Sequence, residues 1–288
     1  MHPPQQYWFN LVLLAIGCVA VPTNILVVWM AWRLRHRSIE IRIALILALV
    51  DMLLAGLIVL TSLLNLGCVG LFHSFRSFCR FKGPVDFILL YVSLVLVSLI
   101  AITRYFKVKS SSIPHLIWVI IVACTSLYGS VICIAAAKGE FSTSLSGFDC
   151  TPIATNSIIS AVVQFSLGFF MFVSFMAGLF AYLGILSCVD TAHDVSCSTT
   201  HRPKLVLIRV ACILLTNLSL VAPSSVLIML EGSRNSNESN LLSSVVSILV
   251  ALNILANPCL VLFAHSGISK NLMSFFNSPF SHICYSPE

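Results

Sequence analysis

The sequence predicts an all-α membrane protein, a bundle of seven transmembrane helices. Of its 288 residues, 58% are hydrophobic and only 9% are charged, whereas soluble domains carry about 25% charged residues. Seven apolar segments are long enough to cross a hydrocarbon core of about 30 Å, which takes about 20 helical residues. Little chain is left over for a soluble domain, so we expect one domain over residues 1–288.

The expected helices follow one another with short connections. The first has no Lys or Arg before it and is too long for the core of a cleavable secretory signal, so we expect it to be retained. The sequence shows no internal repeat, which argues against transporters built from repeats. The predicted spans are 8–32, 43–66, 78–107, 115–137, 158–187, 204–231 and 241–265.

Lys and Arg are distributed unequally between the two sides. The richer side is expected in the cytoplasm, which places the N-terminus outside a plasma-membrane protein. The net charge of +6 indicates flanking residues that contact anionic lipid and does not imply nucleic acid. The cytoplasmic side has Arg33, Arg35, Arg37, Arg42, Arg104, Lys107, Lys109, Arg202, Lys204, Arg209 and Lys270, against Arg76, Arg80, Lys82, Lys138 and Arg234 outside.

Two of the eleven cysteines lie where a disulfide is expected. Cys79, at the outer start of the third span, and Cys150, in the loop before the fifth, face the oxidising side and can pair. Cys68 lies near the same surface and is the competing partner. Asn237, in the triplet Asn-Glu-Ser, is an expected glycosylation site on that side.

The third span carries a line of polar residues. Asp51 and Asp86 are the acidic residues within the spans, and ionisable groups in hydrocarbon are functional candidates by default. At about 100° per residue, Asp86 and Arg104 point the same way, and Ser93 is displaced from them by about 20°. One face of this helix is therefore polar from the outer side to the cytoplasmic mouth.

Further polar residues fall at the same depth in other spans, namely Asn24, Asp51, Asn253 and Asn257. Because an unsatisfied polar group in lipid costs several kcal/mol, roughly, we expect them to converge. Asp51, Ser93, Asn253 and Asn257 offer oxygen ligands suited to a monovalent cation such as sodium. The alternative is hydrogen bonding that only holds helices together.

A set of motif residues occurs in order along the spans: Asn24, Leu47 to Asp51, Cys79, Thr103-Arg104-Tyr105, Trp118, Tyr182, Pro223 and Asn257-Pro258. With these residues the chain resembles a divergent rhodopsin-like (class A) G protein-coupled receptor from the first span to about residue 278. The resemblance implies an outer ligand pocket, outward movement of span 204–231, and a heterotrimeric G protein as partner. It also implies a sodium chamber, an amphipathic helix over about 267–277, and a palmitoylation site at Cys284, for which a free tail cysteine is the alternative.

The residues expected to couple and switch are those that match the family's motifs at the inner side. The resemblance also shows departures: Thr103 replaces an acidic residue, Pro203 a second one, and Val261 a tyrosine. Arg104 is therefore expected to lack its usual charge partners, which predicts a weakly restrained resting state and ligand-free activity. The coupling set is Thr103, Arg104, Tyr105, Tyr182, Pro223, Asn257 and Pro258.

Asp86 occupies the position at which amine receptors of this family pair with a ligand ammonium. A small cation is thus one expected ligand, with a peptide amine or a lipid as others; a salt bridge from Asp86 to Lys82, one turn away, is the structural alternative. Ala251 replaces the lysine that retinal needs, so no retinal is expected. The expected pocket residues are Asp86, Phe87, Leu90, Tyr91, Ser166, Val221, Ser224, Ser225 and Ser247.

Other functional classes receive less support. An intramembrane enzyme would need clustered ligands or a nucleophile triad, but the eight histidines are scattered through loops and helix ends, so no enzyme is expected. A cation transporter or channel does not account for the ordered motifs. A non-signalling or decoy receptor remains the main alternative, because of Thr103 and Val261.

Overall fold

The computed structural model describes residues 3–34, 38–67, 76–143, 150–152, 158–195, 202–233 and 240–264. The predicted glycosylation site Asn237, the acylation site Cys284, the competing Cys68 and the amphipathic helix over 267–277 all lie outside these ranges. Their assignments stay predictions.

The described chain confirms the predicted fold class. It contains seven helices long and apolar enough to cross a membrane, so the chain is a multi-pass membrane protein. All seven predicted spans correspond to helices, and most helices extend a few residues beyond the prediction. The helices are α1 (Pro3–Arg33), α2 (Ile39–Gly67), α4 (Arg76–Val108), α5 (His115–Ala137), α6 (Ile158–Val195), α7 (Arg202–Ser233) and α8 (Asn240–Ala264).

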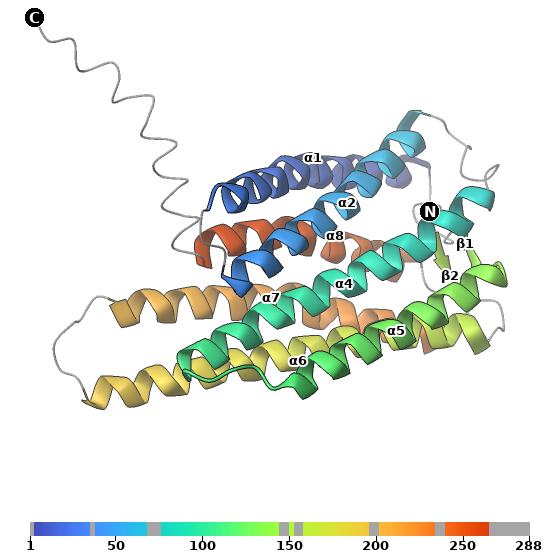
Figure 1. Ribbon diagram of the computed structural model, residues 1–288. Coiled ribbons are helices and arrows are strands. Elements are labelled where there is room, and N and C mark those ends of the chain that lie inside the picture. Colours follow the sequence, from blue (N-terminus) through green and yellow to red (C-terminus); the bar gives the residue numbers. More distant parts are fainter. Residues whose placement is uncertain are drawn as a thin grey trace, which may run out of the picture.

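The helices run back and forth as a bundle with α4 at its centre (Figure 1). Helix α4 packs against α2, α5 and α6, while α8 closes the other side by contacting α1, α2 and α7. Since α4 touches elements on several sides, its polar face meets neighbouring helices rather than lipid. The helix that carries the predicted polar line is therefore the one best placed to connect the two ends of the bundle.

Two short strands join α5 to α6. Strands β1 (Phe141–Thr143) and β2 (Cys150–Pro152) pair antiparallel, with Thr143 opposite Cys150. The start of α1 and this hairpin lie at the same end of the bundle (Figure 1). We call it the hairpin end and the opposite end, where α4 finishes, the Arg104 end.

The predicted disulfide is present. Cys79 near the start of α4 bonds Cys150 of β2, with the Cα atoms 5.1 Å apart. Beside it, Gly83 leaves room for the hairpin, because a Cβ there would lie 2.4 Å from the Phe141 ring and 3.1 Å from the Cys150 carbonyl oxygen. The hairpin is thus fixed against the first turns of α4.

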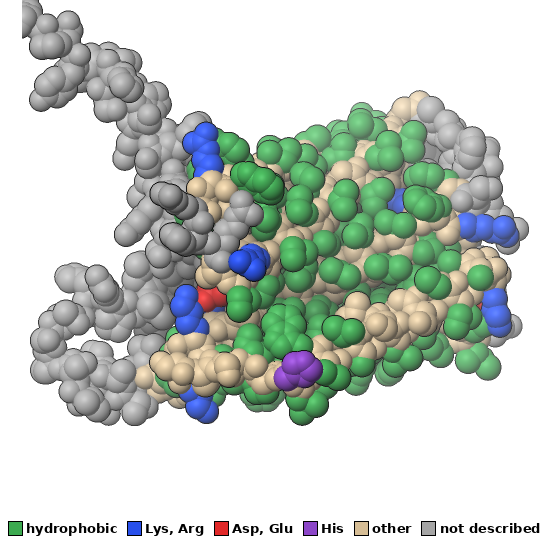
Figure 2. All heavy atoms as spheres, in the orientation of Figure 1, with side chains coloured by type: hydrophobic (Ala, Val, Ile, Leu, Met, Phe, Trp, Pro, Cys, Tyr) green, Lys and Arg blue, Asp and Glu red, His purple; other side chains and the backbone are tan. Residues whose placement is uncertain are grey.

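The outer surface is that of a membrane protein. Large apolar side chains such as Leu127, Phe165 and Leu215 are more than half exposed, which a soluble bundle would bury. Figure 2 shows hydrophobic side chains over the middle of the visible face, with Lys and Arg gathered toward its two ends. This is the surface expected of helices in contact with lipid.

Candidate functional site

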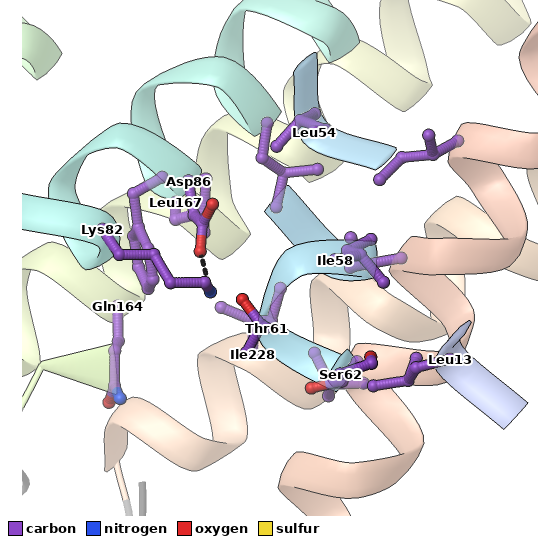
Figure 3. Close-up of a pocket in the computed structure, with 16 residues that line it drawn as sticks. Leu13, Leu54, Ile58, Thr61, Ser62, Lys82, Asp86, Gln164, Leu167 and Ile228 are labelled. Carbon is purple, nitrogen blue, oxygen red and sulfur yellow. Dashed lines mark hydrogen bonds and ion pairs between the residues drawn. The ribbon is translucent and has the colours of Figure 1, made fainter. Parts of the chain in front are cut away.

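A cavity of about 110 Å³ opens among the helices toward the hairpin end. Residues from α1, α2, α4, α6, α7 and α8 line it (Figure 3), and most of them are apolar. An engineered apolar cavity of about 150 Å³ binds benzene, so this space is of the size that takes up one small molecule.

Lys82 and Asp86 of α4 form a salt bridge at the wall of this cavity (Figure 3). They lie one helical turn apart, and their side chains are 4% and 19% exposed. Of the two readings that the sequence allowed for Asp86, the structure contains the salt bridge. The carboxylate therefore already has a cationic partner.

The structure brings together only some of the predicted pocket residues. Asp86, Phe87, Leu90 and Ser247 line the cavity, whereas the other five do not. Tyr91 instead stacks in an aromatic cluster, 4.6 Å from the ring of Tyr128. The remaining residues outside the cavity are Ser166, Val221, Ser224 and Ser225.

The three serines among these residues donate hydrogen bonds to backbone carbonyls of their own helices. The hydroxyl of Ser166 donates to Val163, that of Ser224 to Val221 and that of Ser225 to Ala222. Val221 lines a smaller, separate cavity between α4, α6 and α7. Sequence position alone did not reveal these local bonds, which occupy hydroxyls that a ligand was expected to use.

Residues that the pattern missed complete the cavity wall. Thr61, Ser62 and Gln164 line it and are 5%, 1% and 5% exposed. Their signal in the sequence was weak, since single neutral polar residues are common in transmembrane helices. The Thr61 hydroxyl donates to the Leu57 carbonyl over 2.6 Å, so its own oxygen remains able to accept a hydrogen bond.

The predicted polar cluster in the middle of the bundle is present. The Ser93 hydroxyl donates to one Asp51 carboxylate oxygen over 2.6 Å, and the Asn257 amide donates to the other over 2.9 Å. These bonds join α2, α4 and α8. Asn253 is 5% exposed, and no bond among the described residues ties its amide to Asp51.

The oxygen atoms of the Asp51 cluster could form part of a binding site for a small hard cation such as sodium. A carboxylate and a hydroxyl oxygen are suitable ligands, whereas Asn257 turns its amide nitrogen toward Asp51. An amide's oxygen and nitrogen are assigned from its neighbours, and exchanging them would supply a third oxygen. Asn24 of α1, which was expected to join this cluster, donates its amide to the Ala20 carbonyl of its own helix over 2.9 Å, and its buried amide oxygen has no hydrogen-bond partner in the described chain.

The Arg104 cluster contains a charge partner that the sequence did not predict. Arg104 was expected to lack the two partners usual in the family, at positions 103 and 203, and its Nε instead lies 3.7 Å from Oε2 of Glu40 at the start of α2. Lys107 approaches the other oxygen of Glu40 at 3.1 Å. Glu40 thus takes the role of a charge partner, although it does not stand at either position that the family uses for this purpose.

Arg104 also reaches α6. Its Nη1 donates to the hydroxyl of Tyr182 over 3.3 Å, so one guanidinium connects α2, α4 and α6. Thr103 is buried and donates to the Ile100 carbonyl of its own helix. The ring of Tyr105 packs against Gly184, where a Cβ would lie 2.6 Å from the ring.

A third cavity, of about 30 Å³, lies between the Asp51 cluster and the Arg104 cluster. Asn257 lines it from the Asp51 side, and Arg104 and Tyr182 line it from the other. Val261, where the resemblance expects a tyrosine, is also part of its wall. A volume of this size has room for one water, which takes roughly 10–15 Å³, between Asn257 on one side and Arg104 and Tyr182 on the other.

Comparison with known proteins adds no assignment. No family model matches the chain, and no curated protein matches it either.

Proposed function

We propose that the chain is a divergent rhodopsin-like G protein-coupled receptor. It binds an extracellular ligand in the cavity at the hairpin end and activates a heterotrimeric G protein at the Arg104 end. The observation that carries the proposal is the polar face of α4: Asp86, Ser93 and Arg104 each contact a different partner along one helix. A helix that only filled the bundle would have no need of these groups in hydrocarbon.

The disulfide supports the orientation of the proposal. A bond between Cys79 and Cys150 forms in an oxidising compartment, which supports an orientation with the hairpin end outside the cell in a plasma-membrane protein. The Arg104 end then faces the cytoplasm, where Arg33, Arg42, Lys107 and Lys109 also lie.

The contacts of Arg104 support a switching role. Its guanidinium connects α4 to Glu40 of α2 and to Tyr182 of α6, and these bonds depend on where the three helices stand. A ligand shifts such an equilibrium only by binding one arrangement more tightly than the other. A G protein that inserts at this end would compete with these bonds for Arg104.

Sodium is proposed as a modulator rather than a cofactor. Asp51 and Ser93, with the oxygen of Asn257 after an amide flip, would hold the ion between α2, α4 and α8. An ion there would favour the arrangement in which these three helices are close.

The test is nucleotide exchange on purified heterotrimeric G proteins representing each Gα class, with the receptor in lipid nanodiscs. Wild type should accelerate exchange on at least one class above empty nanodiscs, even without added ligand, and Arg104→Ala should not. If no class responds to wild type of confirmed folding, the non-signalling receptor becomes the better description.

A further inference from the structure

The charges inside the ligand cavity cancel. Its lining residues all lie in the described part of the chain, and among them Lys82 and Asp86 are the only ionisable ones. They are bonded to each other. The cavity therefore presents one ion pair of zero net charge within an otherwise uncharged wall.

The ion pair restricts what Asp86 can do. The two side chains lie at i and i+4 of the same helix, so movement of one helix against another does not separate them. The Lys82 side chain is only 4% exposed. A ligand ammonium that took Asp86 for itself would leave the Lys82 ammonium buried, without its carboxylate and beside a like charge, which is strongly unfavourable.

An anionic ligand is disfavoured for the same physical reason. A carboxylate that took Lys82 would leave Asp86 beside a like charge in a partly dry cavity. Neutral groups meet no such opposition: the wall supplies hydrogen-bonding partners without net charge in Thr61, Ser62 and Gln164, and the rest of it is mainly apolar.

We propose that this cavity selects a small, uncharged and mainly apolar ligand whose one hydrogen-bonding group meets the Lys82–Asp86 pair. The proposal rests on the proposed receptor function for its biological meaning, but the binding chemistry stands on the cavity itself. It replaces the small cation that the position of Asp86 suggested in the sequence. The volume of about 110 Å³ sets the scale at a single small ring or a short chain.

The test uses three probes of similar size and different charge: 4-fluorobenzyl alcohol, 4-fluorobenzylammonium and 4-fluorobenzoate. Binding to the purified protein at neutral pH is followed by fluorine NMR, without any G protein. Val246→Phe, which fills the cavity from α8, is the control for partition into detergent or lipid, because only saturable binding lost in that variant is counted.

Wild type should bind the alcohol at least tenfold more tightly than either ion. Lys82→Met removes the ammonium group that balances the Asp86 carboxylate, so it should reverse the order in favour of the ammonium probe. Asp86→Asn removes the carboxylate that balances Lys82, so it should favour benzoate. If a single variant does not fold, the uncharged double variant Lys82→Met/Asp86→Asn should still prefer the alcohol. The order of the three probe affinities in wild type is then sufficient to test the proposal.

Three results would overturn the proposal. They are tighter binding of the ammonium probe than of the alcohol by wild type, the same order of the probes in wild type and both single variants, and no saturable binding by any of the proteins. The binding assay contains no G protein, so it is independent of the nucleotide-exchange assay. If the protein binds the alcohol but does not accelerate nucleotide exchange, only the proposed function is contradicted. A receptor that signals but prefers the cation would contradict only this inference.

Discussion

Two ion pairs on α4 differ in what they connect. Lys82 and Asp86 are both on α4, near the hairpin end. Arg104, near the other end of the same helix, pairs with Glu40 of α2 and with Tyr182 of α6. The first pair moves with one helix, whereas the second set of bonds exists only while three helices keep their relative positions.

This difference separates two tasks. In the proposed receptor, an ion pair within one helix would not respond to movement of the helices against one another, but it would set the net charge that a ligand meets. A pair between helices has little to do with ligand chemistry, but it stabilises one arrangement of the bundle over others. The Asp51 cluster lies between them and joins α2, α4 and α8 through hydrogen bonds to a single carboxylate.

The largest effect is expected at the Lys82–Asp86 pair. Removing one member of a buried pair leaves an uncompensated charge, which typically costs about 3 kcal/mol or more. Lys82→Met should therefore lower the free energy of unfolding, measured by thermal or denaturant unfolding of the purified protein, by about 3 kcal/mol. The double variant Lys82→Met/Asp86→Asn should regain most of that loss; equal stability of the single and double variants would show that the charges are not coupled.

The next effect concerns sodium at the Asp51 cluster. At a sodium concentration ten times its dissociation constant, binding to the folded state alone stabilises by about 1.4 kcal/mol. Replacing sodium chloride by N-methylglucamine chloride at equal ionic strength should lower the melting temperature of wild type. Asp51→Asn should show no such difference, and an equal sodium response in both proteins would remove the ion from this cluster.

Glu40 tests the bonds between helices. A partly buried ion pair between helices contributes on the order of 1 kcal/mol, which changes the ratio of two states about fivefold. Glu40→Gln should thus raise ligand-free nucleotide exchange about threefold to fivefold relative to wild type at equal receptor concentration. Unchanged exchange would mean that the Glu40 contact does not stabilise the resting arrangement.

The smallest effect is expected at Lys107, which supplies the matched control. Its side chain contacts the same carboxylate as Arg104 but is 70% exposed, so solvent screens the interaction to less than about 0.5 kcal/mol. Lys107→Gln should leave basal exchange within twofold of wild type. A rise as large as that of Glu40→Gln would locate the restraint in Lys107 instead of Arg104.

The helices and the central cluster were predictable from the sequence for physical reasons. A transmembrane helix requires about 20 apolar residues, so spans such as His115–Ala137 can be read directly from the sequence. Buried polar groups require partners, so Asp51, Ser93 and Asn257 were expected to meet. The disulfide followed from the side of the membrane on which its cysteines lie.

The partners of long charged side chains were harder to predict. Glu40 reaches Arg104 across the sequence because α2 and α4 pack together at that end, which no motif encodes. The spacing of Lys82 and Asp86 is evident in the sequence. Spacing alone does not determine whether Asp86 forms a salt bridge within its helix or pairs with a cationic ligand. Ser224 and Ser225 lie beside the expected pocket in sequence, yet their hydroxyls bond to their own helix.

The most direct measurement compares Lys82→Met and Glu40→Gln in two assays, the relative affinity for the alcohol and ammonium probes and ligand-free nucleotide exchange. We predict that Lys82→Met reverses the affinity ratio of the two probes, while its basal nucleotide exchange stays within twofold of wild type. Glu40→Gln should raise basal exchange and leave that ratio unchanged. A reversed ratio in Glu40→Gln, or raised exchange with an unchanged ratio in Lys82→Met, would contradict the division of tasks between the two ends of α4.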